Sequence, residues 1–138
     1  MATQIQQAER FLALHRQPQP LLLPNPWDLG SAKLLAWLGF SALATTSSGF
    51  AATVGRLDGQ VTRDEAIDHA AAVVRATDLP VSADLENGFS DTAAGVAETG
   101  SVCGFARNFG SVSFLGFWST SLLNSAICFT RLSVNHRR

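Results

Sequence analysis

Residues 80–89, PVSADLENGF, decide the fold, because a short apolar run passes there directly into a cluster of polar and acidic residues. The apolar run predicts a buried strand over residues 81–85. Residues two apart in an extended segment point the same way, so the carboxylates of Asp84 and Glu86 are expected to face one site. The spacing leaves two interpretations open: oxygen ligands for Mg²⁺, or solvated acids of a loop or helix cap.

Upstream of this stretch, segments typical of strands alternate with segments typical of helices. We expect strands over residues 20–24 and 42–46, and helices over residues 4–14, 28–38 and 62–74. The last helix opens with a capping box formed by Thr62 and Glu65. This alternation indicates an α/β fold with a parallel sheet, as a barrel or as a doubly wound open sheet. In both architectures ligands bind at the carboxyl ends of the strands.

Two polar segments follow the second predicted strand. The Ser/Gly loop of residues 47–49 could hold a carboxylate or phosphate through hydroxyl and backbone N–H groups, or could simply be a turn. Asp58 lies in GRLDG, which could be a mobile loop carrying a site acid or an ordinary Asp-Gly turn. His69, within the helix that begins at Thr62, is expected on the protein surface.

The composition is that of a globular protein and excludes several functional classes. The chain is 46% hydrophobic and 15% charged, with a net charge of −1. This balance predicts no binding to nucleic acid or to an anionic membrane surface. No apolar run is long enough to span a membrane, and the first residues do not resemble a signal peptide. We therefore expect a cytoplasmic protein with two reduced cysteines.

The acidic residues divide the chain in two. All eleven lie at or before Glu98, whereas residues 99–138 contain four arginines and no acid. A single domain rarely changes composition so abruptly. We expect residues 1–98 to form one unit and residues 99–138 to be an unrelated tail, produced by truncation or a frameshift.

Three ordered stretches give the chain a resemblance to a known family. Residues 23–28 (LPNPWD), 42–50 (ALATTSSGF) and 82–89 (SADLENGF) resemble the isocitrate lyase / phosphoenolpyruvate mutase family over about residues 11–98. The resemblance implies the N-terminal portion of a (β/α)8 barrel that is incomplete here. It implies Mg²⁺ as cofactor and a small α-oxo acid or related carboxylate as substrate. A C–C or P–C bond next to the α-oxo acid or its enolate would be cleaved or formed, and family members are homo-oligomers.

The same resemblance implies roles for individual residues. Ser48, Gly49 and Phe50 match the loop that binds the substrate carboxylate, and Asp58 matches a catalytic acid close to the metal. Asp84 matches the direct metal ligand, and Glu86 matches a second acid that acts through water. Many family members carry Asp where this chain carries Glu86.

The resemblance is partial. A complete barrel needs about 250 residues, and the fourth-strand Glu-Asp pair of the family has no match here. Two alternatives therefore stand beside the lyase or mutase. One is a truncated, catalytically inactive fragment, and the other is a small binding module that uses the half site.

Overall fold

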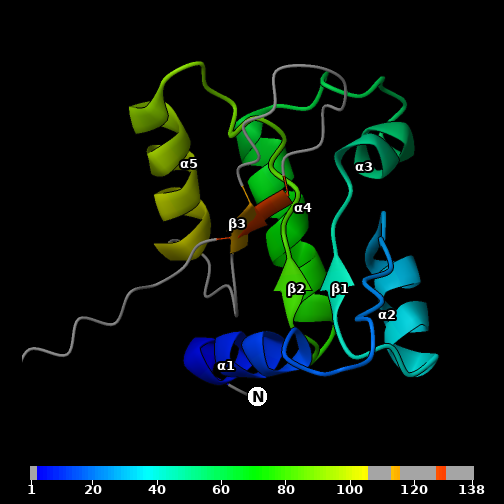
Figure 1. The fold of residues 1–138 in the computed structure, drawn as a ribbon. Helices are drawn as coiled ribbons and strands as arrows, with labels where there is room; N and C mark the ends of the chain where they lie inside the picture. Colours follow the sequence, from blue (N-terminus) through cyan, green and yellow to red (C-terminus); the bar gives the residue numbers. More distant parts are fainter. Residues whose placement is uncertain (1–2, 106–112, 116–126, 130–138) are drawn as a thin grey trace, which may run out of the picture.

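The structure, a computed structural model, describes residues 3–105, 113–115 and 127–129. Helices and short strands alternate along most of this part of the chain, as Figure 1 shows. In chain order the elements are α1 (Gln4–Leu14), α2 (Leu29–Trp37), β1 (Leu43–Ala44), α3 (Ser47–Thr53), α4 (Arg63–Ala76), β2 (Val81–Ser82), α5 (Ala93–Phe105), β3 (Ser113–Leu115) and β4 (Ile127–Phe129).

The centre of the fold is a parallel pair formed by β1 and β2. Leu43 is in register with Val81, and Ala44 with Ser82. The N–H of Leu43 donates to the Pro80 carbonyl at 3.0 Å, and the N–H of Thr45 donates to the Ser82 carbonyl at 2.9 Å. The connection between the strands contains α3 and α4. The parallel α/β arrangement predicted from the alternating pattern is therefore confirmed for these two strands.

The strand predicted over residues 20–24 does not form, and that prediction is wrong. Pro24 runs beside β1, where its carbonyl accepts the N–H of Ala44 at 3.1 Å, and the side chain of Asn25 donates to the Ala44 carbonyl at 3.0 Å. Pro20, Pro24 and Pro26 have no N–H to offer to a strand ladder. The segment therefore follows β1 without completing a third strand.

Local capping signals place the helices accurately. The side chain of Asp28 accepts the N–H of Ser31 at the start of α2, and Thr62 forms a capping box with Glu65 at the start of α4. Gly39, just after α2, has a φ of +89°, a backbone conformation that glycine adopts without strain. The predicted bounds of these helices are confirmed to within two residues.

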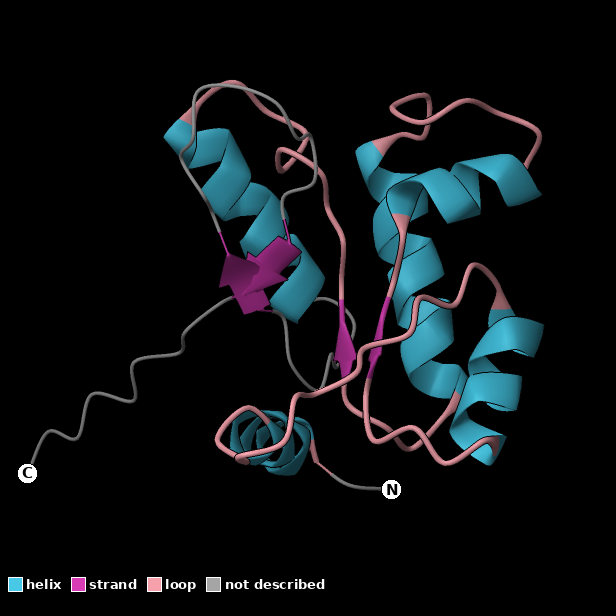
Figure 2. Ribbon diagram, turned by 45° about the vertical axis from the view of Figure 1, so that its right-hand side comes forward, coloured by secondary structure: helices cyan, strands magenta, loops and turns pink. Residues whose placement is uncertain are grey.

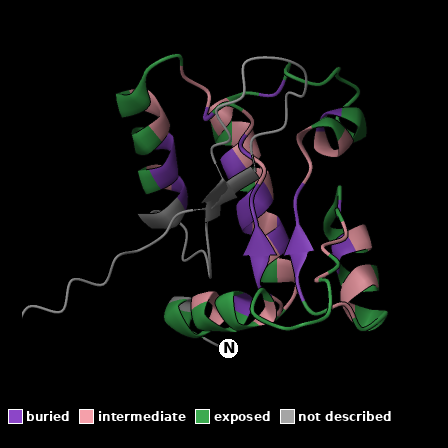
Figure 3. Ribbon diagram, in the orientation of Figure 1, coloured by how far each residue is buried: buried purple, intermediate pink, exposed green. Residues whose placement is uncertain are grey.

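The core lies where α2, α4 and α5 pack on the strand pair, and Figure 3 shows the buried residues gathered there. It consists of two adjoining clusters of buried side chains. One contains Ala32, Leu43, Val73 and Val81, and the other contains Ile67, Ala70, Ala71, Ala83, Leu85 and Cys103. Fully burying a valine, leucine or isoleucine side chain contributes about 1.5–3 kcal/mol, and the alanine methyl groups contribute less.

Helix α1 lies across the amino ends of the two strands, as Figures 1 and 2 both show. Gln7 donates through its side chain to the Asp78 carbonyl at 2.8 Å, and Arg10 reaches the same oxygen at 3.5 Å. Phe11 is 2% exposed. With α1 on this side, the carboxyl ends of β1 and β2 point away from it, toward α3 and the loop after β2.

Helix α5 runs through the boundary predicted at Glu98 and continues to Phe105. Thr99 and Cys103, which follow that boundary, are both buried. Further along, β3 and β4 pair antiparallel, and β4 lies against β2. Most of the tail predicted over residues 99–138 lies outside the described residues, so its origin stays a prediction. In the described part of the chain, no helix is long and apolar enough to cross a membrane.

Candidate active site

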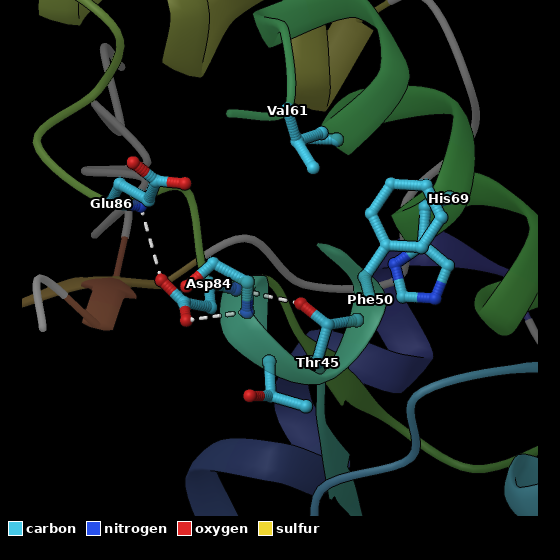
Figure 4. A pocket seen from close by; sticks show the side chains of 9 residues that line it. Thr45, Phe50, Val61, His69, Asp84 and Glu86 are labelled. Atoms are coloured by element: carbon cyan, nitrogen blue, oxygen red, sulfur yellow. Dashed lines mark hydrogen bonds between the residues drawn. The ribbon is translucent and has the colours of Figure 1, made fainter. Parts of the chain in front are cut away.

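A small open pocket lies at the carboxyl ends of β1 and β2, with about 230 Å³ of space not filled by atoms. Its position is the one expected for a ligand site in a parallel α/β fold. The lining residues are Thr45, Thr46, Ser47, Phe50, Val61, Ala66, His69, Asp84 and Glu86. In Figure 4 the carboxyl groups of Asp84 and Glu86 lie on one side, and the rings of Phe50 and His69 lie on the other.

Asp84 is held in place by three hydrogen bonds. Its N–H donates to the hydroxyl oxygen of Thr45 at 2.8 Å. Its Oδ2 accepts the N–H of Ser47 at 3.0 Å, and its Oδ1 accepts the N–H of Glu86 at 3.0 Å. Thr45 is only 4% exposed, so this contact ties the end of β1 to the end of β2 in the protein interior. Each carboxylate oxygen retains a lone pair for another partner.

Glu86 reaches the pocket by a different route from the one predicted. Strand alternation would place it beside Asp84, but its φ is +50°, in the left-handed region. It lies in a turn closed by the N–H of Gly88, which donates to the Leu85 carbonyl at 2.8 Å. Holding a non-glycine residue there costs on the order of 1–3 kcal/mol, and such strain is concentrated at functional sites. Asp84 and Glu86 share one pocket, as expected. The cause is a turn with positive φ at Glu86, and not the strand alternation on which the expectation rested.

Helix α5 anchors this turn. The hydroxyl of Thr99 donates to the Gly88 carbonyl at 2.8 Å inside the protein. Gly88 has a φ of +79°, and a Cβ at this position would come within 2.9 Å of Val96. The turn that carries Glu86 therefore requires glycine at position 88 and the N-terminal half of α5 beside it.

Residues 47–49 form the first turn of α3 and not a loop, which corrects the prediction for this segment. Thr46 caps the helix, with its hydroxyl oxygen accepting the N–H of Gly49 at 3.4 Å. Phe50 lines the pocket as predicted, whereas Ser48 and Gly49 are not among the lining residues. Ser47, the first residue of the segment expected to hold a carboxylate or phosphate, lies at the pocket, and its backbone N–H donates to the carboxylate of Asp84.

Asp58 lies on the exposed connection between α3 and α4. Arg56 anchors this connection through Nη1, which donates to both carboxylate oxygens of Glu65 at 2.9 and 2.8 Å. The Arg56 guanidinium, together with hydrogen bonds from Thr62, lowers the pKa of Glu65 to about 2. Asp58 does not line the pocket but comes close enough for its negative charge to act on Glu86.

The surroundings of Glu86 raise the pKa of its carboxyl group. Burial is the main cause, and the negative charges of Asp58 and then Asp84 add to it. In the described part of the chain the salt bridges join Arg56 to Glu65 and Arg63 to Asp64 and Glu98, so none of them neutralises these three acids. Among the residues that the structure describes, no lysine or arginine lines the pocket beside which these acids gather.

His69, which was expected on the protein surface, is half-buried and lines this open pocket. Its ring stacks on Phe50 with 3.9 Å between ring centroids and 8° between planes. Its Nε2 lies 3.0 Å from the Trp27 carbonyl oxygen. Helical spacing offered a signal, because residues three apart share a face of a helix, and Ala66, three residues before His69, also lines the pocket.

With this geometry in view, comparison with known proteins identifies the family. The family model described as phosphoenolpyruvate phosphomutase matches residues 11–122. The chain belongs to the phosphoenolpyruvate phosphomutase family. The match extends beyond Glu98, where the resemblance seen in the sequence motifs ends.

Curated relatives place this member of the phosphoenolpyruvate phosphomutase family near lyases. It is 39% identical over 83 residues to a 2-methylisocitrate lyase of Halalkalibacterium halodurans, an alignment that covers 59% of this chain and 28% of the relative. It is 40% identical over 89 residues to an uncharacterized protein of Mycobacterium tuberculosis, covering 64% of this chain and 34% of that protein. The chain thus spans about a third of the length of the curated relatives it matches.

Solved structures agree with this assignment. A structure from Burkholderia cenocepacia J2315, described as a lyase/mutase, has a TM-score of 0.75 and 49% identity, covering 80% of this chain and 39% of that one. The structure of a 2,3-dimethylmalate lyase of the same superfamily has a TM-score of 0.66 and 26% identity, covering 82% of this chain and 39% of that one. The α/β fold is therefore that of the superfamily, within the part that this chain covers.

The residues at the pocket fit the Mg²⁺ ion that the family fold implies. Within the described ranges, no group of three or more His, Cys, Asp or Glu side chains is close enough to enclose a metal ion. Mg²⁺ does not require such a cage, because it usually binds one or two carboxylates and keeps several waters. Asp84 and Glu86 both line the pocket and supply hard oxygen ligands there.

Proposed function

We propose that this protein is a Mg²⁺-dependent lyase or mutase acting on a small α-oxo acid or related carboxylate. The reaction would cleave or form a C–C or P–C bond next to the α-oxo acid or its enolate. The observation that carries the proposal is the gathering of Asp58, Asp84 and Glu86 near the carboxyl ends of two parallel strands, where the salt bridges between described residues neutralise none of the three. Membership of a family of lyases and mutases supports it.

The proposed roles follow from position and chemistry. Asp84 would bind the metal directly, because backbone N–H groups fix its carboxylate at the pocket. Glu86 would act through a bound water, and Asp58 would be the catalytic acid on the connection between α3 and α4. When bound, Mg²⁺ would act as a Lewis acid for the developing enolate oxygen.

The substrate would lie between the acids and the start of α3. Ser48, Gly49 and Phe50 are proposed to contact its carboxylate, with Phe50 already on the pocket wall. The named activities of two relatives, a 2-methylisocitrate lyase and a 2,3-dimethylmalate lyase, support a small carboxylate. We further propose that β1 and β2 are strands of a (β/α)8 barrel in the complete enzyme.

A second candidate is a chain that binds Mg²⁺ and a carboxylate without turning it over. The same absence of a third close metal-binding side chain in the described ranges favours it. Both candidates predict Mg²⁺ binding that depends on Asp84, and they differ in turnover.

Calorimetric titration with Mg²⁺ tests the site first. Asp84→Ala should abolish measurable binding, whereas Asp78→Asn should not change it, because Asp78 lies at the opposite ends of the strands and serves there through its backbone carbonyl. Release of an α-oxo acid from 2-methylisocitrate or 2,3-dimethylmalate, lost in Asp84→Ala, would support the enzyme. Binding without turnover would favour the second candidate, and equal Mg²⁺ binding by Asp84→Ala would overturn the proposed site.

A further inference from the structure

His69 connects three segments that meet beside the pocket. It projects from α4, its ring stacks on Phe50 of α3, and its Nε2 reaches the carbonyl of Trp27, in the turn before α2. Both partners matter, because Phe50 lines the pocket and Trp27 packs behind the first turn of α3.

The packing behind α3 is close. A Cβ on Gly49 would meet the Cγ2 of Thr46 at 2.6 Å and the Cβ of Trp27 at 3.2 Å. The first turn of α3 is thus already in contact with the segment whose carbonyl His69 binds. A shift of Trp27 would therefore move Gly49 and Phe50, and with them the wall that faces Asp84 and Glu86 in Figure 4.

The partners of His69 determine its tautomer. A carbonyl oxygen only accepts hydrogen bonds, so Nε2 must carry the hydrogen that points at Trp27. Burial lowers the pKa of His69, although the Trp27 carbonyl and the charge of Asp28 act in the opposite direction. A neutral ring with hydrogen on Nε2 also stacks on Phe50 without bringing a charge into this side of the pocket.

We propose that His69 is a positioning residue for the reaction: its hydrogen bond to Trp27 and its stack on Phe50 hold the first turn of α3 at the distance from Asp84 and Glu86 that the substrate requires. This inference rests on the proposed function for its effect on the reaction. Its effect on α3 does not depend on activity and can be measured separately.

Two variants separate the two contacts of His69. His69→Gln keeps a side-chain donor for Trp27 and removes the ring, whereas His69→Phe keeps the ring and removes the donor. His15 provides a matched control at the other end of the strands. Its ring also contacts a phenylalanine ring, that of Phe11, with 4.4 Å between the ring centroids. Its Nδ1 lies 2.9 Å from the Phe11 carbonyl oxygen. His15→Gln therefore removes a ring contact, and His15→Phe removes a hydrogen bond, both far from the pocket.

Hydrogen exchange measured by mass spectrometry tests the role in the full chain. Both His69 variants should speed exchange in Ser47–Thr53 by roughly fivefold or more, since each loses one stabilising contact, and should leave Ala93–Phe105 unchanged. The His15 variants should leave Ser47–Thr53 unchanged. Unaltered exchange in Ser47–Thr53, or an equal increase in both helices, would overturn the proposal. Imidazole nitrogen NMR should show hydrogen on Nε2, and hydrogen on Nδ1 would also overturn it.

Kinetics then test the link to the substrate. With a substrate that is turned over, His69→Gln should raise KM by roughly tenfold and change kcat by less than about threefold, because a displaced wall weakens binding of substrate and transition state alike. An unchanged KM beside altered exchange would refute the positioning role. If Mg²⁺ binding and turnover are both absent, the proposed function fails, while the exchange result still decides whether His69 positions α3.

Discussion

The backbone N–H of Ser47, the first residue of α3, donates to Oδ2 of Asp84, the residue that begins the loop after β2, at 3.0 Å. Thr45 completes the link, because its hydroxyl accepts the N–H of Asp84 at 2.8 Å. The ends of two neighbouring strands are thus joined through one residue, Asp84, by its carboxylate and by its backbone N–H. This arrangement gives the aspartate a fixed orientation before any ligand binds.

Thr45→Val tests the hydrogen bond that joins Thr45 to Asp84. The substitution keeps the shape of the side chain and leaves the N–H of Asp84 without its acceptor in a nearly buried position. We expect a loss of about 1–3 kcal/mol in the free energy of unfolding, measured by urea denaturation. Thr53→Val is the control, because Thr53 loses only an exposed hydrogen bond to Phe50. An equal loss in both variants would contradict the assigned role of Thr45.

Gly49→Ala should distort the start of α3. The new Cβ would lie 2.6 Å from Thr46 Cγ2, and relieving such a clash costs about 1–3 kcal/mol. Gly30→Ala in α2 is the matched change, since its Cβ would have an ordinary contact of 3.5 Å with Asp28. Alanine is the better helix former there, so Gly30→Ala should raise the melting temperature while Gly49→Ala lowers it. A higher melting temperature for both variants would show that α3 yields to the added methyl group.

Glu86→Gln should stabilise the protein at neutral pH in the absence of metal. The pKa of Glu86 is raised in the folded state by burial and by Asp58 and Asp84. Its contribution to stability is therefore present below its unfolded pKa of about 4.5 and is lost as the pH rises through the folded pKa. Thermal unfolding should show the variant melting higher than the wild type at pH 7, with the difference vanishing near pH 3. A variant that melts lower at pH 7 would contradict this charge balance.

Arg56→Ala should change the acid titration of Glu65. The pKa of Glu65 is held at about 2 mainly by Arg56. Its stabilising effect is present above the unfolded pKa of 4.5 and is lost as the pH falls toward about 2. Without Arg56 the carboxyl signal in an NMR titration should move to higher pH. Arg63→Ala removes the contacts to Asp64 and Glu98 instead and should leave the Glu65 signal unchanged.

Cys103 should be almost unreactive while the protein is folded. It is fully buried, and burial raises the pKa of its thiol to about 12. Thiolate is the reactive form, so alkylation by iodoacetamide near neutral pH should be slower than for a free thiol by a factor on the order of 10³. The measurement uses a Cys128→Ser variant, so that only Cys103 is followed. Rapid labelling under native conditions would contradict the packing of α5.

How much of the fold the sequence could predict depended on how local the determining contacts were. Asp28 and the Thr62–Glu65 pair are caps whose partners lie three residues away, so α2 and α4 were predictable. Residues 20–24 read as a strand because of their apolar run, but a strand also needs N–H donors, which the prolines remove. Helix α3 depends on Gly49 fitting against Trp27, a contact between distant segments that no local pattern reveals.

The candidate site was predictable in its position and only partly in its geometry. The position of Asp84 at the pocket could be predicted directly, because this residue follows a buried strand. Glu86 was placed at the same pocket through strand alternation, whereas a turn with positive φ brings it there. The place of His69 at the pocket depends on where α3 and the turn at Trp27 lie relative to α4, and that relation appears only in three dimensions.

The parallel register of β1 and β2 has a consequence for how the chain folds. Leu43 pairs with Val81, so the two strands cannot meet until two residues separated by 38 positions in the chain (81 − 43) have been brought together. Closing a loop of that length costs about 3 kcal/mol in entropy, more than a two-residue ladder returns. The strands therefore form only as α4 packs on them and buries Ile67, Ala70 and Val73. Helix α4 would accordingly belong to the folding nucleus, and the pocket would appear in the same cooperative step as the sheet.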